Sequence, residues 1–288
     1  MHRIFLRALL LLIALVPIVN APAQAQTKTD ILVLGDSQIS FSAGGPYLDF
    51  FGNLEARCNA TDADQAALAT LGKPNVAAIG VRSTSLNSWT ARSGRAKGTI
   101  CDVDKKFGVN AGAFGVNGNP KRRFVQIGQG ADYQFCQANT SPLESVVRAG
   151  YYDPKLIIFA LLGNNAERWA SDAETARKDA REMMRQMPDD IACIMLTTAP
   201  VFEKKTNDLR MRAQENLRTA FAEEGAQCAF VAGFSTATRT VIEGRTQYFA
   251  RHSDGRIKDP FHPNASAIRQ FLDLNTSAIC EAVFEVLE

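Results

Sequence analysis

The feature that most constrains the fold of this 288-residue chain is the alternation of short apolar runs with longer amphipathic segments. The apolar runs read as strands at 29–34, 76–81, 124–127, 156–162, 191–198 and 228–231. The longer segments read as helices at 47–57, 171–187, 207–224 and 265–287. Runs that are apolar throughout are typical of strands buried on both faces of a parallel sheet. The alternation therefore predicts an α/β fold with a mostly parallel, doubly wound sheet.

One region does not follow this alternation. Residues from about 98 to 142 are rich in Gly and Asn, as in the run GVNAGAFGVNGNP at 108–120. A long segment of this kind inside a compact domain is usually a functional or disulfide-tied insertion. We interpret it as an insertion at the rim of the site, within a single domain that spans residues 26–288.

The N-terminus has the order of a secretory signal. Residues 1–7 carry two arginines and no acid, residues 8–19 are apolar apart from Pro17, and Ala23-Gln24-Ala25 offers small residues for cleavage. The apolar run is shorter than the ~20 residues that span a bilayer, so an uncleaved anchor is the less favoured alternative. Residues 1–25 are thus predicted to be a signal peptide. The mature protein is expected to be periplasmic or secreted, without stable membrane insertion.

The net charge and the cysteines limit the kinds of ligand that the chain is expected to bind. The formal net charge of +2 gives no electrostatic case for binding nucleic acid. None of the six cysteines forms a C-x-x-C, and no His lies close to one in the sequence, so no metal site is expected. In an oxidising compartment an even count favours disulfides, whose pairing the sequence cannot choose. We suggest Cys101 with Cys136, because both lie in the Gly/Asn-rich region.

Two polar phrases follow predicted strands: GDSQ at 35–38 and GNNAE at 163–167. Ligands of doubly wound sheets bind at the carboxyl ends of the strands, where both phrases fall. The first phrase presents Ser37, whose hydroxyl becomes a good nucleophile only when a base takes its proton. The alternative is that Ser37 caps the following helix.

His262 is the best base that the chain offers to Ser37. A neutral imidazole can accept the serine proton and then return it to a leaving group. Asp259 lies three residues earlier, where its carboxylate could fix the tautomer of the ring. Alternatively, Asp259 makes a turn or caps the last helix. Of the other histidines, His2 leaves with the signal, and His252 lies in a polar stretch typical of a surface.

Together these phrases resemble the SGNH/GDSL hydrolase family. The matching blocks are Gly-Asp-Ser at 35–37, Gly-Asn-Asn at 163–165 and Asp-Pro-Phe-His at 259–262, so the likeness spans the mature chain. The resemblance implies a three-layer α/β/α sandwich of SGNH/flavodoxin-like type, and ester hydrolysis through an acyl-serine without metal or organic cofactor. It implies that Ser37 attacks, that His262 is general base and then acid, and that Asp259 orients His262.

An oxyanion hole is also expected. The side-chain amide of Asn165 can donate to it, together with the backbone N–H of Ser37, although Asn is also common in turns and caps. A third donor is expected from the backbone after the second strand. The candidates for that donor are Gly80, Arg82 and Ser83. Gln38 stands where the family commonly has Leu, and Ala166 where it often has Asp, but neither change removes a catalytic group.

The sequence says less about the substrate. Trp89 and Trp169 follow two predicted site loops and could stack on a sugar ring, although core packing is an equal alternative. Arg82, Arg92 and Arg168 lie near the same loops and could meet a substrate carboxylate. Ordinary surface charge is the reading we favour for these arginines.

The lead prediction is an exported serine hydrolase that cleaves ester bonds, specifically an acetyl esterase acting on carbohydrate. A carbohydrate O-acetyltransferase that uses the same acyl-serine is the first alternative, and only the acceptor distinguishes it. A non-catalytic carbohydrate-binding protein on the same fold is the second. The presence of the Ser, Asn, Asp and His together argues against this last possibility.

Overall fold

The computed structural model describes residues 29–58, 62–92, 111–114, 125–127, 140–148, 152–224 and 228–288. The predicted signal peptide at 1–25 lies outside these ranges, and so do Cys101 and Cys136. Of the predicted insertion, the structure describes two short strands, β3 (Ala111–Phe114) and β4 (Val125–Ile127), and its last residues. No helix within the described ranges is long and apolar enough to cross a membrane.

A seven-stranded sheet in the order β4-β3-β2-β1-β5-β6-β7 lies at the centre. Five neighbouring strands are parallel. Beyond β2 the sheet continues with β3, which is antiparallel to β2, and with β4, which is antiparallel to β3. The five are β1 (Ile31–Gly35), β2 (Val76–Val81), β5 (Leu156–Ala160), β6 (Ala192–Leu196) and β7 (Cys228–Val231). Their side chains are buried almost throughout, as the apolar runs predict.

The order of the strands defines where a ligand can enter. The chain passes from β1 to β2 on one side and later returns to β5 on the other side of β1. The loops after β1 and β5 therefore flank the switch point of the sheet, which is the usual binding crevice of a doubly wound fold.

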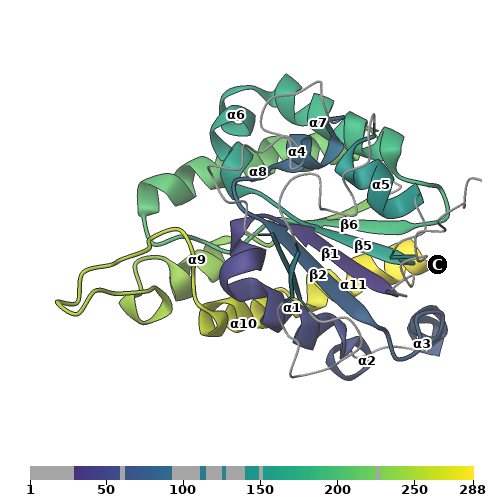
Figure 1. The fold of residues 1–288 in the computed structure, drawn as a ribbon, viewed down its shortest axis with the longest axis horizontal. Helices are drawn as coiled ribbons and strands as arrows, with labels where there is room; N and C mark the ends of the chain where they lie inside the picture. The colour runs from purple at the N-terminus through teal and green to yellow at the C-terminus, as the bar shows by residue number, and fades with distance from the viewer. Residues whose placement is uncertain are drawn as a thin grey trace, which may run out of the picture.

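Helices cover both faces of the sheet (Figure 1). On one face lie α4 (Leu86–Thr90), α5 (Pro142–Arg148), α6 (Ala166–Ser171), α7 (Ala173–Gln186) and α8 (Lys204–Glu224). On the other lie the π-helical turn η1 (Ile39–Ala43), α1 (Gly44–Phe51), α2 (Leu54–Arg57), α3 (Asp62–Ala69), α9 (Thr236–Ile242), α10 (Ala265–Leu274) and α11 (Thr276–Leu287). Successive β1 residues alternate between the two cores, since strand side chains alternate in direction. The predicted three-layer α/β/α class is confirmed.

Several helix boundaries differ from the sequence prediction. The helix expected at 47–57 is interrupted at Gly52 and Asn53, which separates α1 from α2. The helix expected at 265–287 is two helices, separated at Asn275. Helices α3, α4, α5, α6 and α9 were not predicted, because segments of five to eight residues are too short to show a clear helical period.

Within the part of the chain that the structure describes, two disulfides cross the fold, as the even cysteine count favours. Cys58, just after α2, is bonded to Cys280 of α11. Cys193 and Cys228 are bonded across the neighbouring strands β6 and β7. These bonds are typical of proteins that fold in an oxidising compartment.

Candidate active site

The candidate nucleophile lies on a tight turn directly after β1. Asp36 is buried, and its Oδ1 accepts the backbone N–H of Gln38 at 2.8 Å, which closes the turn around Ser37. Gly35 allows the chain to turn back so closely, because a Cβ there would lie 2.3 Å from Cγ1 of Ile39. A side chain at this position would push η1 outward and displace the serine.

The loop before α10 supplies the second half of the site. Asp259 Oδ1 accepts the backbone N–H of Phe261 at 3.0 Å and that of His262 at 3.2 Å, so the Asp-Pro-Phe-His phrase folds into one turn. Asp259 Oδ2 lies 2.7 Å from His262 Nδ1, and His262 Nε2 lies 2.8 Å from Ser37 Oγ. The structure therefore brings together the three side chains that the sequence singled out.

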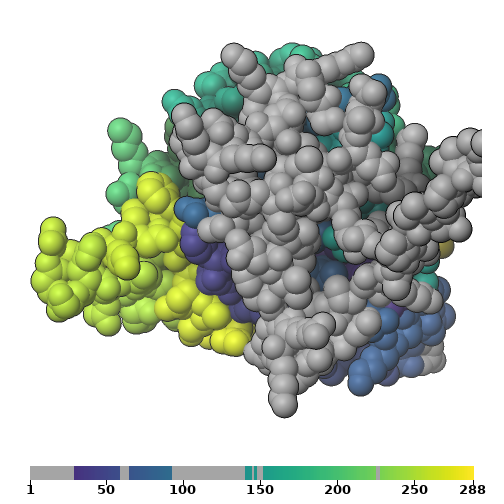
Figure 2. All heavy atoms as spheres, viewed as in Figure 1, coloured from purple at the N-terminus to yellow at the C-terminus, as the bar shows by residue number. Residues whose placement is uncertain are grey.

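Two further contacts join the serine turn to the histidine loop. Buried Gln38 donates from Nε2 to the carbonyl of Phe261 at 3.4 Å and to that of Ala199 at 3.2 Å. Ser42 Oγ donates to the carbonyl of Pro263. Figure 2 shows the N-terminal segment in purple directly beside the yellow C-terminal segment. These contacts hold the serine turn against the histidine loop and so fix the spacing between Ser37 and His262.

The third block lies on η5 (Gly163–Asn165), a 3₁₀ turn after β5. Asn165 is buried, and its Nδ2 donates to Asp179 Oδ2 at 3.1 Å. The same carboxylate oxygen accepts the indole N–H of Trp169 at 2.9 Å. Burial raises the pKa of Asp179, and the indole hydrogen bond opposes that shift. One amide hydrogen of Asn165 is therefore bonded to Asp179. Among the described residues, no hydrogen bond joins the side chain of Asn165 to Ser37.

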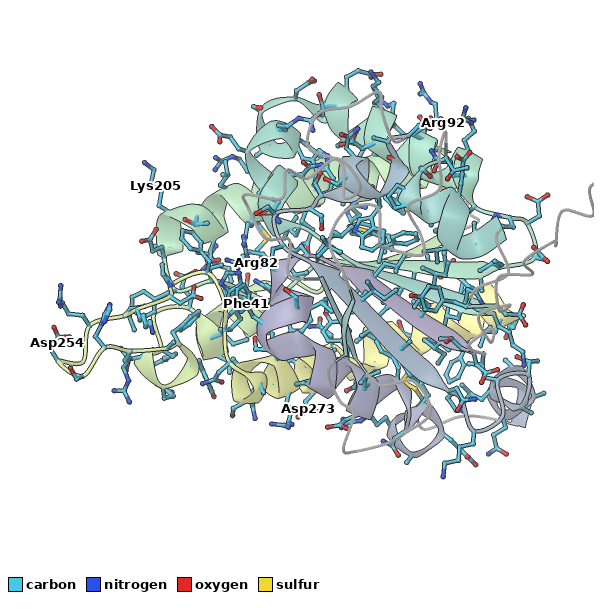
Figure 3. All side chains as sticks on the ribbon, in the orientation of Figure 1. Phe41, Arg82, Arg92, Lys205, Asp254 and Asp273 are labelled. Atoms are coloured by element: carbon cyan, nitrogen blue, oxygen red, sulfur yellow. A yellow bond between two sulfur atoms is a disulfide. The ribbon has the colours of Figure 1, made fainter. Side chains whose placement is uncertain are left out.

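The three backbone candidates after the second strand occupy different settings. Gly80 lies inside β2 between β1 and β3, and a Cβ there would lie 2.3 Å from the backbone nitrogen of Ser40. Its role is therefore to let η1 pack closely on the sheet. Arg82 and Ser83 lie in the turn beyond β2, and Figure 3 labels Arg82 beside Phe41 at that end of the sheet. Ser83 has φ +61°, which is uncommon for a residue with a side chain.

Asn164 and Thr84 connect the loops after β5 and β2. The side chain of exposed Asn164 donates from Nδ2 to the carbonyl of Thr84 at 2.7 Å. Thr84 Oγ1 in turn donates to the carbonyl of Val81 at 2.7 Å. The loop that carries Arg82 and Ser83 is therefore held against the neighbouring loop.

Two buried side chains of opposite charge, Asp36 and Arg210, influence each other near these turns. Arg210 of α8 is 6% exposed and donates from Nη1 to the carbonyl of Ala199 at 3.1 Å. A Cβ on Gly163 would lie 2.4 Å from Arg210 Nη2, so the guanidinium packs directly under η5. Burial lowers the pKa of Arg210 to about 10. Burial also raises the pKa of Asp36, while the Gln38 N–H and the charge of Arg210 oppose that shift.

The two tryptophans do not face a substrate. Trp89 of α4 and Trp169 of α6 are both 0% exposed and belong to the same hydrophobic core. The prediction that they stack on a sugar is therefore wrong. Both rings lie on the inner face of a short helix, where a large aromatic side chain gains most from packing against the sheet.

The remaining candidates are exposed side chains. His252 is exposed, as its polar surroundings predict. Arg92 donates to Glu144 Oε1 at 3.2 Å, in agreement with ordinary surface charge. Arg168 is exposed on α6. Within the described ranges, no group of His, Cys, Asp or Glu side chains could hold a metal ion.

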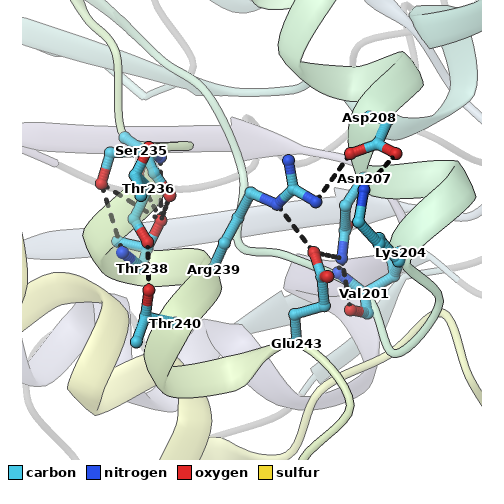
Figure 4. A network of polar contacts seen from close by, with 11 residues as sticks. Val201, Lys204, Asn207, Asp208, Ser235, Thr236, Thr238, Arg239, Thr240 and Glu243 are labelled. Carbon is cyan, nitrogen blue, oxygen red and sulfur yellow. Dashed lines mark hydrogen bonds and ion pairs between the residues drawn. The ribbon is translucent and has the colours of Figure 1, made fainter.

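A polar network on α8 and α9 fixes the chain that follows β6 (Figure 4). Asn207, which is 0% exposed, donates from Nδ2 to the carbonyl of Val201 at 2.8 Å and accepts the Val201 N–H on Oδ1 at 2.9 Å. Phe202, which follows Val201 in the chain, donates its N–H to the carbonyl of Pro260 at 2.8 Å. The network therefore also supports the loop that carries the histidine.

The sequence reasoning missed Gln38, Asn164 and Phe41 as members of the site. One feature of the sequence indicates Gln38: a polar residue stands where the resembled family commonly has Leu. A buried side-chain amide needs hydrogen-bond partners, so this residue could have been expected to join two segments. Asn164 could have been weighed beside Asn165, since both occupy the same strand end. The ring centroid of Phe41 lies 4.5 Å from that of His262. No local feature of the sequence indicates that Phe41 lies beside the histidine.

Comparison with known proteins adds similarity at the level of solved structures. No protein-family model matches the chain, and no curated protein matches it. A structure described as a peptidoglycan O-acetylesterase aligns with a TM-score of 0.41 and 12% identity, over 89% of this chain and 91% of that one. The C-terminal catalytic domain of a peptidoglycan O-acetyltransferase from Streptococcus pneumoniae aligns with a TM-score of 0.40 and 12% identity, over 90% and 95%.

Proposed function

We propose that residues 26–288 form one exported domain of the SGNH/GDSL type, a serine esterase that hydrolyses acetyl esters of carbohydrate. One observation carries the proposal: Ser37 Oγ lies 2.8 Å from His262 Nε2, and His262 Nδ1 lies 2.7 Å from Asp259 Oδ2. Hydroxyl, imidazole and carboxylate in this order form the proton-transfer system of serine hydrolases. The signal-like order of residues 1–25 and the two disulfides support export.

The chemistry proceeds in two halves. Ser37 Oγ attacks the carbonyl carbon of the ester while its proton passes to His262 Nε2, and Asp259 stabilises the imidazolium. The bond from carbon to the alcohol oxygen then breaks, and Nε2 returns the proton to that oxygen. Water attacks the resulting acyl-serine by the same route, which releases acetate and restores the hydroxyl of Ser37.

Both halves pass through a tetrahedral oxyanion that needs hydrogen-bond donors. We assign them to the backbone N–H of Ser37, to the backbone N–H of Arg82 or Ser83, and to the second amide hydrogen of Asn165. Asp179 accepts the first hydrogen of that amide and so sets its plane. Gly80 is not included, because its backbone belongs to the sheet.

Hydrolysis of 4-nitrophenyl acetate by the purified mature protein tests the proposal. Ser37→Ala and His262→Ala should each lower kcat by about 10⁴-fold or more, and the double variant should be little worse than either, since the two residues act as a unit. His252→Ala is the matched control, because this exposed histidine should leave the rate unchanged. Hydrolysis that survives Ser37→Ala, or losses that add in the double variant, would contradict the serine mechanism.

A further inference from the structure

An exposed aromatic surface lies beside the candidate triad. Within the described part of the chain, the large apolar side chains that are strongly exposed are Phe41, Phe261 and Leu274. Two of the three flank the histidine: Phe261 precedes it in the chain, and the ring of Phe41 lies 4.5 Å from the imidazole ring. Phe41 is 48% exposed, so about half of its surface is open to solvent. Exposed aromatic rings next to reactive groups are typical of binding surfaces.

A positive charge lies over the same ring. The guanidinium carbon of Arg82 lies 4.7 Å from the centroid of Phe41, and Figure 3 shows the two residues side by side. Arg82 is exposed, and no carboxylate of the described residues pairs with it. Arg92, by contrast, is neutralised by Glu144. The contact with Phe41 holds the guanidinium in one place, which lowers the entropic cost of binding an anion.

The chemistry of the triad determines which part of an ester this surface meets. His262 Nε2 returns its proton to the oxygen of the leaving alcohol, so that oxygen must lie within hydrogen-bond reach of Nε2. The ring of Phe41 contacts the same imidazole at a tilt of 46°, and the guanidinium of Arg82 lies over Phe41. The alcohol part of the substrate, and not its acyl part, therefore lies along Phe41 toward Arg82.

An exposed arm at 250–258 adds further positive charge to this side of the molecule. It carries Arg251, Arg256 and Lys258, all exposed, and of these Arg256 is paired with Asp254. The arm leads directly into Asp259, and Figure 3 shows Asp254 at its projecting tip.

We propose that Phe41 and Arg82 form the alcohol-side subsite and that this subsite takes a sugar bearing a carboxylate, so that the substrate is an O-acetylated acidic carbohydrate. The inference rests on the proposed esterase function. The exposed part of the aromatic ring contacts the sugar, and the guanidinium beside it pairs with the carboxylate. The backbone N–H of Arg82 stays available to the oxyanion hole.

Two aryl acetates test the charge preference directly. 4-Carboxyphenyl acetate carries the anion on the alcohol part, and 4-carbamoylphenyl acetate is its neutral match. Corrected for their rates in alkali, kcat/KM should favour the charged ester by about tenfold, as expected for one charge-assisted pair. Arg82→Gln should remove this preference, Arg82→Lys should keep part of it, and Arg92→Gln should leave it unchanged. Equal kcat/KM for both esters, or an equal loss for both in Arg82→Gln, would overturn the subsite.

Binding separates failure of the subsite from failure of the esterase. Ser37→Ala protein should bind an O-acetylated galacturonate oligomer about tenfold more tightly than an O-acetylated xylose oligomer by calorimetry. Adding Arg82→Gln should abolish that difference. If the parent protein hydrolyses no ester but this Arg82-dependent difference is seen, the subsite is supported and the esterase function is refuted. If the parent hydrolyses aryl acetates but the Ser37→Ala protein binds both oligomers equally, the subsite is refuted and the esterase function is supported.

Discussion

Asp259→Asn should lower kcat for ester hydrolysis by about 10³- to 10⁴-fold and leave the fold intact. The reason is that the two carboxylate oxygens have different partners. Oδ1 accepts the backbone N–H groups of Phe261 and His262, whereas Oδ2 faces His262 Nδ1. An NH₂ group cannot accept those backbone hydrogens, so the amide oxygen of the variant must take the place of Oδ1. The amide nitrogen then faces Nδ1 and donates to it.

That single donated hydrogen changes the tautomer of the ring. When Nδ1 accepts, the neutral imidazole must carry its hydrogen on Nε2, which can then no longer take the proton of Ser37. We expect the lower end of the range, about 10³-fold, because the side chain of Asp259 is 32% exposed and water can reorganise around it. Stability should fall by no more than about 1 kcal/mol, since both backbone N–H groups keep an acceptor.

The assay is kcat for 4-nitrophenyl acetate, measured together with urea unfolding. Asp254→Asn, on the same loop and away from the histidine, is the matched control and should keep full activity. Asp259→Ala should lose similar activity but about 1–2 kcal/mol of stability, because it also removes the acceptor of two backbone N–H groups. An Asp259→Asn enzyme with more than about one tenth of the parent kcat would refute the tautomer argument.

Three other changes test the framework around the site. Gln38→Leu removes the side-chain tether between serine turn and histidine loop, so kcat should fall about tenfold with KM nearly unchanged, since only positioning is lost; steady-state kinetics checks this. Asn207→Ala leaves the buried backbone N–H and C=O of Val201 without partners, and should cost about 2–3 kcal/mol by urea unfolding. Replacing Cys58 and Cys280 by Ala opens a link between residues 222 apart and should cost about 4 kcal/mol in the same assay.

The parts of the site that could be predicted are those encoded in short local phrases. Ser37 ends a buried apolar strand, and Asp259 and His262 share one turn, so each position is read from a few neighbouring residues. The rule that ligands bind where parallel strands end then places the phrases at one edge of the sheet. The sheet itself was predictable for the same reason, because fully buried strands require continuous apolar runs.

The parts that could not be predicted depend on packing between distant segments. Trp89 and Trp169 follow site loops in the sequence, yet both rings turn inward, and only the position of the neighbouring helices decides this. Asn165 likewise has a partner, Asp179, that lies on the next helix but one and leaves no mark near the Asn in the sequence. Antiparallel β3 falls in a region whose Gly and Asn content indicates a loop, because its pairing with β2 outweighs weak strand propensity.

The alcohol-side subsite also bears on the choice between hydrolysis and transfer. An alcohol that attacks the acyl-serine must occupy the position that the first alcohol left, because the same Nε2 of His262 serves both steps in reverse. A carboxylate-bearing sugar held by Phe41 and Arg82 would therefore exclude water and compete as acceptor. Raising the concentration of an unacetylated galacturonate oligomer should divert turnover from acetate release to acetyl transfer, measured by mass spectrometry of the oligomer. Arg82→Gln should return turnover to hydrolysis, whereas transfer that persists in this variant would show that the acceptor binds elsewhere.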